Sequence, residues 1–275
     1  MKHPSAYLLV SHGSRDPRPQ KAMDALASLM AARLQSFELF EPELQGRELH
    51  PVKRDRSGIA QQVIEPAIAP VPLIATAVLE LHPLPLHQQI QQFAEQAIAL
   101  GYGSVKILPL FLLAGVHVID DIPAEVAIAQ RSLEHRITLE QCLHVGHYPQ
   151  IQQLIVNACE VPAHATKVLV AHGSRRSQGN DLVEAIAQRI GAVTAYWSRE
   201  PRLETQVMMV IEAGCRDIAV LPYFLFAGGI TDAIAQQVNA LSIQHPAVCF
   251  YMAQPLGARP EFADQLTEVL QSELP

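Results

Sequence analysis

Two histidines and one glutamate carry side chains that could do chemistry, and each follows an apolar run in the first half of the chain. They are His12, Glu80 and His117. Two imidazoles and a carboxylate suit a divalent first-row metal ion that keeps open coordination positions. They equally suit a site that accepts protons, because imidazole titrates near neutral pH. The residue types therefore predict either a metal site or a proton-transfer site.

The chain contains the same passages twice. Three passages of the first copy return in the same order: 7–15 (YLLVSHGSR) as 167–175 (KVLVAHGSR), 107–115 (ILPLFLLAG) as 220–228 (VLPYFLFAG), and 145–149 (VGHYP) as 256–260 (LGARP). Three anchors in one order indicate a duplicated domain. One copy is therefore a control for the other, because the fold does not require a polar group that only one copy has.

The two copies differ at the residues that could do chemistry. The aligned pairs are His12 with His172, Glu80 with Ser198, and His117 with Ile230. If His117 and Glu80 served the fold alone, the second copy would need them as well. We therefore expect the first copy to be the working half and the second to close the cleft opposite it.

Apolar runs and amphipathic stretches alternate strictly along both copies. The predicted strands are 7–10, 73–79, 105–112 and 142–145, then 168–171, 193–197, 218–225 and 248–251. The predicted helices are 19–34, 86–100, one from about 122, and 150–158, then 182–190, 203–213, 231–241 and 261–270. Such alternation predicts right-handed crossovers and parallel sheets covered on both faces.

The predicted fold is therefore α/β, with two tandem domains that are each a small four-stranded parallel sheet flanked by helices. We place the first domain at 1–159 and the second at 166–275, with a linker at 160–166. Ligands of such sheets bind beyond the carboxyl ends of the strands, which is where the HGSR segments fall.

The first copy carries about forty residues that the second lacks, roughly 36–72. A tolerated surface insertion is the favoured interpretation. The alternative is a lid or a basic rim over a ligand site, since Lys53 and Arg54 lie near the middle of the segment.

Composition narrows the class of protein. The formal net charge of −7 argues against a nucleic-acid-binding protein, which needs a basic footprint. No apolar run approaches the roughly 20 residues that span a bilayer, and the N-terminus lacks the apolar region of a signal peptide. The cysteines form no CxxC pair and favour buried reduced thiols; they are Cys142, Cys159, Cys215 and Cys249. We expect a cytoplasmic protein.

Other polar residues have a structural and a functional interpretation. Capping of the following helix is favoured for Asp120 and Asp121 over a catalytic role. For His82 and His87, a solvated position at a helix start is favoured over lining the site.

Two rival enzyme classes lack their required residues. A histidine phosphatase needs an arginine before the histidine, but Ser11 and Ala171 stand there. A serine hydrolase needs a GxSxG elbow, which neither Ser11 nor Ser14 provides.

With these residues in place, the chain resembles the class II tetrapyrrole chelatases, specifically the CbiX/SirB group that acts on sirohydrochlorin. The resemblance covers nearly the whole chain in tandem form and rests on 11–17 (SHGSRDP), 79–81 (LEL) and 109–123 (PLFLLAGVHVIDDIP). It implies that His12 and His117 hold the incoming metal ion and that Glu80 assists. It also implies that the first half carries the active site, in the cleft between the two domains.

The implied reaction is insertion of a divalent metal ion into sirohydrochlorin during siroheme or cobalamin synthesis, which is a lyase activity. The metal is a substrate, Fe²⁺ or Co²⁺ with Ni²⁺ as a further candidate, and no organic cofactor is expected. The tetrapyrrole carries many carboxylates, for which Ser14, Arg15 and Arg175 are candidate contacts, since arginine binds carboxylates bidentately. Further candidates at the rim are Lys53, Arg54 and Arg176.

A fused pair of domains implies a monomer, with no nucleic-acid or membrane partner. The alternative function is a non-catalytic carrier of metal or tetrapyrrole with the same fold. A turnover assay separates the two, because a carrier gives at most one equivalent of metallated product.

Overall fold

The computed structural model describes residues 5–40, 72–157, 161–174, 179–258 and 260–272. We use "first half" for residues 5–157 and "second half" for residues 161–272. The strands of the first half are β1 (Ser5–Ser11), β2 (Ile74–Val78), β3 (Ser104–Pro109) and β4 (Thr138–Gln141), and those of the second half are β5 (Thr166–Ala171), β6 (Ala192–Tyr196), β7 (Asp217–Pro222) and β8 (Cys249–Met252). The helices are α1 (Pro17–Phe40), α2 (Leu86–Ala99), α3 (Ile122–Ser132), α4 (Pro149–Asn157), α5 (Asp181–Ile190), α6 (Leu203–Glu212), α7 (Gly229–Gln244) and α8 (Pro260–Ser272).

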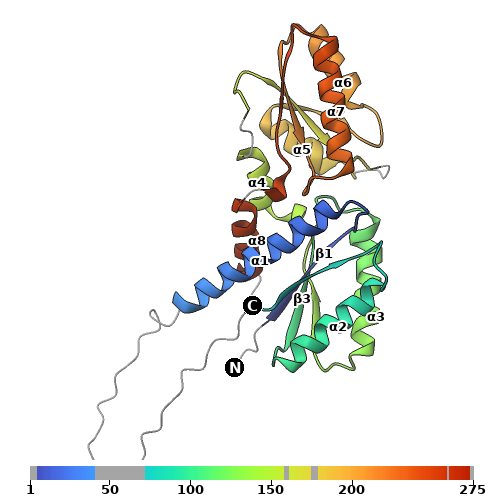
Figure 1. Ribbon diagram of the computed structural model, residues 1–275, viewed down its shortest axis with the longest axis vertical. Coiled ribbons are helices and arrows are strands. Elements are labelled where there is room, and N and C mark those ends of the chain that lie inside the picture. The colour runs from blue at the N-terminus through green and yellow to red at the C-terminus, as the bar shows by residue number, and fades with distance from the viewer. Residues whose placement is uncertain (1–4, 41–71, 158–160, 175–178, 259, 273–275) are drawn as a thin grey trace, which may run out of the picture.

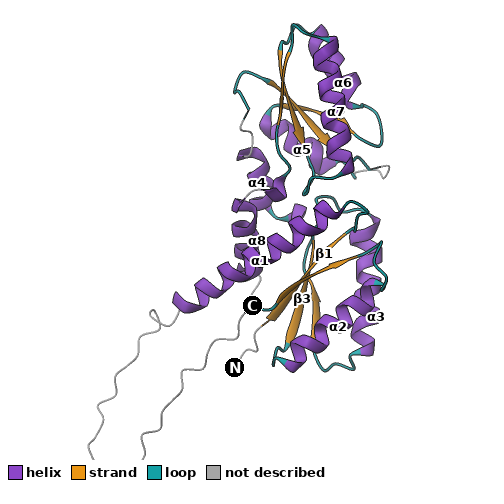
Figure 2. Cartoon of the chain, viewed as in Figure 1, coloured by secondary structure: helices purple, strands orange, loops and turns teal. Residues whose placement is uncertain are grey.

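Each half builds one four-stranded parallel sheet with the same strand order. The order is β2-β1-β3-β4 in the first half and β6-β5-β7-β8 in the second. Figure 2 shows the two sheets one above the other, each with helices against it. The structure confirms the predicted α/β fold of two tandem parallel sheets.

The central strands are apolar because both of their faces are covered. In β1, Leu9 packs in a core cluster with α1, while Leu8 and Val10 pack in a second cluster with α2 and α3. The same arrangement recurs in β5, where Leu169 faces the first cluster. One core cluster therefore extends through both halves, and each half adds a cluster of its own on its outer face.

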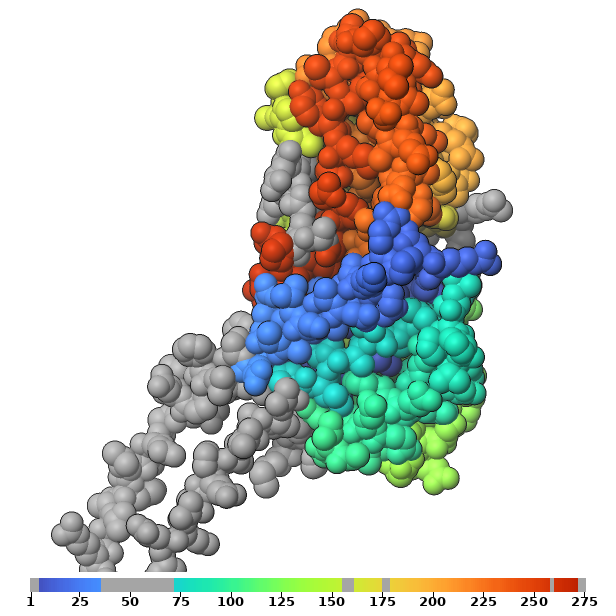
Figure 3. Space-filling view, in the orientation of Figure 1, coloured from blue at the N-terminus to red at the C-terminus, as the bar shows by residue number. Residues whose placement is uncertain are grey.

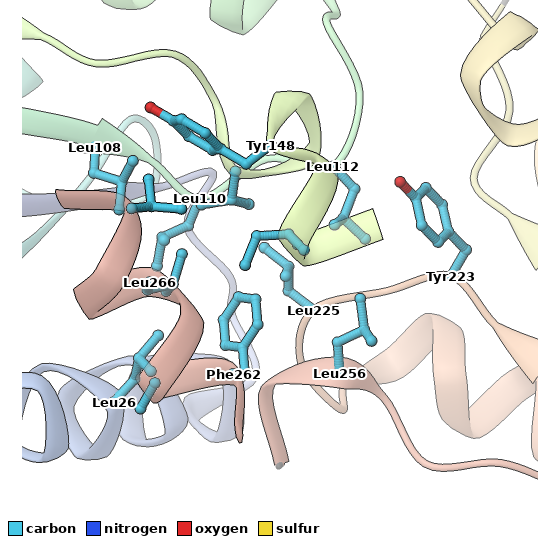
Figure 4. Packing of buried hydrophobic residues seen from close by; sticks show 14 of the residues in the cluster. Leu26, Leu108, Leu110, Leu112, Tyr148, Tyr223, Leu225, Leu256, Phe262 and Leu266 are labelled. Carbon is cyan, nitrogen blue, oxygen red and sulfur yellow. The ribbon is translucent and has the colours of Figure 1, made fainter. Parts of the chain in front are cut away.

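The last helices of the two halves lie between the sheets (Figure 1). Helix α8 packs against α1 of the first half and against α4, and α4 contacts α5 of the second half. Phe262 and Leu266 of α8 are fully buried in the cluster that also contains Leu26 of α1, as Figure 4 shows. The C-terminal segment of the chain thus completes the core of the first half.

The fourth strand of the first half was predicted in the wrong place. The sequence predicted a strand at 142–145, whereas β4 covers Thr138–Gln141 and Val145 begins a short 3-10 helix. Strand β4 is an edge strand whose side chains are mostly exposed, so its sequence is polar. Cys142 and Val145 are buried in the core, but they belong to the segment that follows the strand.

The predicted insertion at 36–72 lies largely outside the described residues. Helix α1 continues to Phe40, so the first five residues of the insertion are helical. Residues 41–71, with Lys53 and Arg54, are outside the described part of the chain. Among the described helices, none is both long and apolar enough to cross a membrane.

Candidate active site

The backbone ladder between β1 and β2 brings His12 beside Glu80. Beyond the strand ends, the N–H of Leu79 donates to the carbonyl of Ser11 and the N–H of Glu80 donates to the carbonyl of His12, each at 2.9 Å. The next residue, Gly13, has a φ of +97°, and a Cβ there would lie 2.2 Å from the carbonyl oxygen of Glu80. Only glycine therefore allows this close approach.

A π-helical turn at the end of the β3 loop positions His117. The turn η2 (His117–Asp121) closes with a hydrogen bond from the N–H of Ile122 to the carbonyl of His117. It brings Nδ1 of His117 within 2.7 Å of Oδ2 of Asp121. A carboxylate only accepts hydrogen bonds, so Nδ1 is the donor and carries the proton. In the neutral form of the ring with this tautomer, Nε2 is the nitrogen without a proton and can bind a metal ion.

The three predicted side chains converge. One ligand atom from each of His12, Glu80 and His117 lies within 4.8 Å of the other two, and no other group of this kind occurs in the described part of the chain. The two imidazole rings meet edge to face, with centroids 4.8 Å apart. His12 points Nδ1 at the carbonyl oxygen of Gly13, 3.2 Å away, which leaves its Nε2 available as well. This geometry is consistent with the predicted grouping of the three residues, which lie far apart in the sequence.

The arrangement around His117 is the one that orients metal-binding histidines in proteins. Such histidines donate their second ring N–H to a carboxylate or carbonyl, which fixes the tautomer and the ring orientation. Asp121 supplies that carboxylate. The sequence analysis favoured helix capping for Asp121, and this was wrong, since its side chain makes no capping hydrogen bond. The i, i+4 spacing of His117 and Asp121 was the signal that could have found the pair.

The second half repeats the backbone of the site without its chemistry. The N–H of Ser198 donates to the carbonyl of His172 at 2.9 Å, as Glu80 does to His12. His172 also points Nδ1 at the carbonyl of the next glycine, 3.0 Å away. The hydroxyl of Ser198 donates to the same carbonyl, at 3.2 Å. The turn therefore forms with serine in place of glutamate, which supports a non-structural role for Glu80.

A cavity of 820 Å³, which we call the central cavity, lies between the two halves. Its walls are mostly apolar, with imidazoles and hydroxyls among them. The residues that line it are His12, Gly13, Leu110, Phe111, Leu112, Leu113, Gly115, Val116 and His117 from the first half, and His172, Gly173, Ser174, Ser198, Tyr223, Phe224, Leu225 and Ile230 from the second. The two histidines of the three-residue site, His12 and His117, and their counterparts in the second half thus line one space.

An ion pair joins the halves beside this cavity. The guanidinium of Arg18 contacts the carboxylates of Asp16 and Asp232, each at 2.5 Å. In Figure 3 the blue start of α1 lies against the orange second half at this boundary. Hydrogen bonds from Arg18 lower the pKa of both carboxyl groups, so the cluster is fully charged at neutral pH. Nothing local in the sequence indicated a pair whose members are so far apart.

The other residues predicted to contact the substrate lie outside the lining of the central cavity or outside the described residues. Ser14 and Arg15 follow the turn and are exposed, and neither is among the described residues that line the central cavity. Ser14 accepts a hydrogen bond from the N–H of Asp16 at 3.0 Å. Arg175 and Arg176 lie outside the described residues. His87 bonds Glu125 of α3 instead of facing the cavity.

Arg199 is a candidate contact that the sequence analysis missed. Its guanidinium lies over the ring of Tyr196, 5.3 Å from the centroid, and donates to the carbonyl of Ser174 at 3.2 Å. These contacts hold a cation beside the second wall of the cavity. Its position directly after Ser198, the counterpart of Glu80, was the available signal.

A family model agrees with the duplicated fold. The model named CbiX matches residues 45–160 and again residues 166–273, which together make up more than half of the chain. The first match begins after His12, so the assignment of that residue rests on the geometry.

Two relatives from Priestia megaterium have similar sequences. One is a sirohydrochlorin cobaltochelatase, 23% identical over 212 residues, with 71% of this chain and 68% of the relative covered. The other is a sirohydrochlorin ferrochelatase, 24% identical over 201 residues, with 67% of this chain and 72% of the relative covered.

Solved structures show the same fold. SirB from Bacillus subtilis with Fe³⁺ matches with a TM-score of 0.69 at 19% identity, over 99% of this chain and 95% of the other. CbiX, the terminal enzyme for biosynthesis of siroheme in denitrifying bacteria, matches with a TM-score of 0.56 at 20% identity, over 98% of this chain and all of the other. The resemblance inferred from the sequence is thus confirmed, and the chain belongs to the CbiX family of class II chelatases.

Proposed function

We propose that this chain is a sirohydrochlorin chelatase that inserts Fe²⁺ or Co²⁺ into the metal-free tetrapyrrole. The observation that carries the proposal is the convergence of His12, Glu80 and His117, of which the two histidines line the central cavity. Similarity to a cobaltochelatase and a ferrochelatase of sirohydrochlorin supports the substrate. We assign catalysis to the domain at 1–159 and treat 166–275 as its degenerate repeat.

In this proposal His12 and His117 bind the incoming metal ion through Nε2, and the carboxylate of Glu80 adds a negative ligand. Imidazole and carboxylate suit borderline divalent ions such as these. Asp121 holds the ring of His117 in the productive tautomer. The apolar walls of the cavity accept the flat macrocycle and exclude water from its face.

Metal insertion releases two protons from the pyrrole nitrogens as four ring nitrogens replace the other ligands of the ion. An imidazole that has given up the metal ion is free to accept one of these protons. Glu80 is exposed, so it can accept a proton and pass it to solvent. The products are the metallated ring and two protons, and no redox partner is needed.

Ser14, Arg15 and Arg175 stay candidate contacts for substrate carboxylates, and Arg199 joins them. Raw affinity follows the general metal series, so affinity alone does not select the physiological metal. The supply of each metal ion also decides which one is inserted, and with it whether the product belongs to siroheme or cobalamin synthesis. A cytoplasmic monomer stays the expectation, with both walls of the cavity on one chain.

The test is a metallation assay of the purified protein with Fe²⁺, Co²⁺ and Ni²⁺ in parallel. The protein should accelerate metallation over the spontaneous rate through many turnovers. His117→Ala should abolish most of the acceleration, and His172→Ala should cost much less. Equal losses from both changes would contradict the asymmetric site, and a single equivalent of product would favour a carrier.

A further inference from the structure

The hydroxyl of Tyr223 is a buried polar group without a hydrogen-bond partner in the described part of the chain. The residue is 3% exposed and stands at the end of β7, where it lines the central cavity. In Figure 4, Leu112 of the first half lies beside the Tyr223 ring. Burying a hydroxyl without a partner lowers stability, and native proteins rarely leave such a group without a reason.

The duplicated fold shows that this hydroxyl is not needed for packing. Tyr223 is aligned with Leu110 of the first half, which is 4% exposed and belongs to the same core cluster. An apolar side chain therefore suffices at this position. As with His117, a polar group in only one copy indicates a role outside the fold.

The chemistry of the hydroxyl defines the partner that it lacks. Burial raises the pKa of Tyr223 well above its usual value, so the phenol stays protonated and offers an O–H donor. A donor in an apolar wall needs an acceptor, and a charged acceptor forms the stronger bond. In a cavity proposed to hold a tetrapyrrole with many carboxylates, the bound molecule brings such acceptors.

We propose that Tyr223 is a specificity-determining residue whose hydroxyl donates a hydrogen bond to a carboxylate of the bound tetrapyrrole. The inference rests on the proposed function. The hydroxyl itself is fully buried in this structure, although the residue lines the central cavity, so the side chains that cover it must move aside for the ligand to reach it. The free protein keeps the donor unpaired, and binding of the substrate satisfies it.

The test uses Tyr223→Phe, which removes the hydroxyl and keeps the ring. Two effects of opposite sign are expected. The free protein should become more stable in urea, because a buried unpaired group is lost. Its affinity for metal-free sirohydrochlorin, measured by fluorescence titration, should fall about tenfold.

Tyr251→Phe is the matched control, because the Tyr251 hydroxyl is already bonded to Asp217 at 3.2 Å and lies on β8, outside the cavity lining. It should lower stability slightly and leave binding unchanged. With a tetrapyrrole whose carboxylates are esterified, the difference in affinity between the wild type and Tyr223→Phe should be smaller, because an ester carbonyl accepts a weaker hydrogen bond than a carboxylate.

The outcomes separate the two proposals. If the wild type binds and metallates sirohydrochlorin but Tyr223→Phe binds it equally well, the inference alone is refuted. A loss of stability in Tyr223→Phe would also refute it, since the hydroxyl would then already have a partner. If the wild type does not bind sirohydrochlorin, both proposals fail.

Discussion

Replacing Asp121 should weaken the proposed metal site, although Asp121 is not itself a proposed metal ligand. The Nδ1–Oδ2 distance of 2.7 Å and the π-helical turn make Asp121 the group that fixes the ring of His117. Loss of such a partner typically costs about 10–100-fold in metal affinity or activity. The side chains of His117 and Asp121 are 34% and 44% exposed, so solvent screens the interaction. We therefore expect about a tenfold effect, or about 1.4 kcal/mol.

The assay is the initial rate of sirohydrochlorin metallation at varied metal concentration. Asp121→Ala should raise the KM for the metal about tenfold and leave the KM for the tetrapyrrole and the melting temperature unchanged. Asp121→Asn keeps an acceptor without the charge, so its effect should be intermediate. The neighbouring exposed Asp120, changed to asparagine, is the control. An unchanged metal KM in Asp121→Ala, or an equal rise in Asp120→Asn, would refute the reasoning.

Three further predictions concern the turn, the ion pair and the C-terminal helix. Gly13→Ala should abolish activity and, in urea unfolding, destabilise the protein far more than Gly101→Ala. A Cβ at Gly13 would lie 2.2 Å from a backbone oxygen, whereas nothing lies within 4 Å of a Cβ at Gly101. The Gly101 change should therefore cost only about 1–2 kcal/mol, for its positive φ. Arg18 lowers the pKa of Asp232, so the ion pair should stabilise the wild type above the ordinary carboxyl pKa of 3.8 and lose this effect as the pH falls further. Arg18→Gln should remove that contribution. A difference in unfolding free energy between the two proteins that grows on acidification would contradict this. Phe262→Ala should lower the free energy of unfolding by about 3–5 kcal/mol, because the side chain is fully buried. Since α8 packs on α1, metallation activity should be lost at the same temperature as helical structure. Parallel melts followed by activity and by circular dichroism would check this.

Much of the fold was predictable because it depends on local periodicity. Continuous apolar runs such as 7–10 identify central strands, since those strands are buried on both faces. The edge strand β4 could not be found in this way, because its side chains are mostly exposed. The packing of α8 against α1 could not be predicted from the sequence either, because an amphipathic pattern shows that one face of a helix is buried but not which surface it packs against.

The candidate site was predictable through the duplication. The comparison of copies selected Glu80 and His117, which no spacing motif connects, and the parallel sheet explains why they meet His12. The pairing of Asp121 was missed because it depends on a π-helical turn, where ordinary helix rules predict a cap. Tyr223 was missed because its lack of a partner is visible only in three dimensions.

The helices α4 and α8 have a consequence for how the two copies could become different. Each carries the chain from its own sheet to contacts with the opposite half, as in a pair of subunits that exchange identical elements. In a symmetric pair of separate chains, every substitution appears at both walls, so a change from His117 to isoleucine would remove the site altogether. Covalent fusion breaks that symmetry. Once both copies lie on one chain, one wall is free to keep the proposed metal-binding residues while the other is selected only for contact with the proposed substrate.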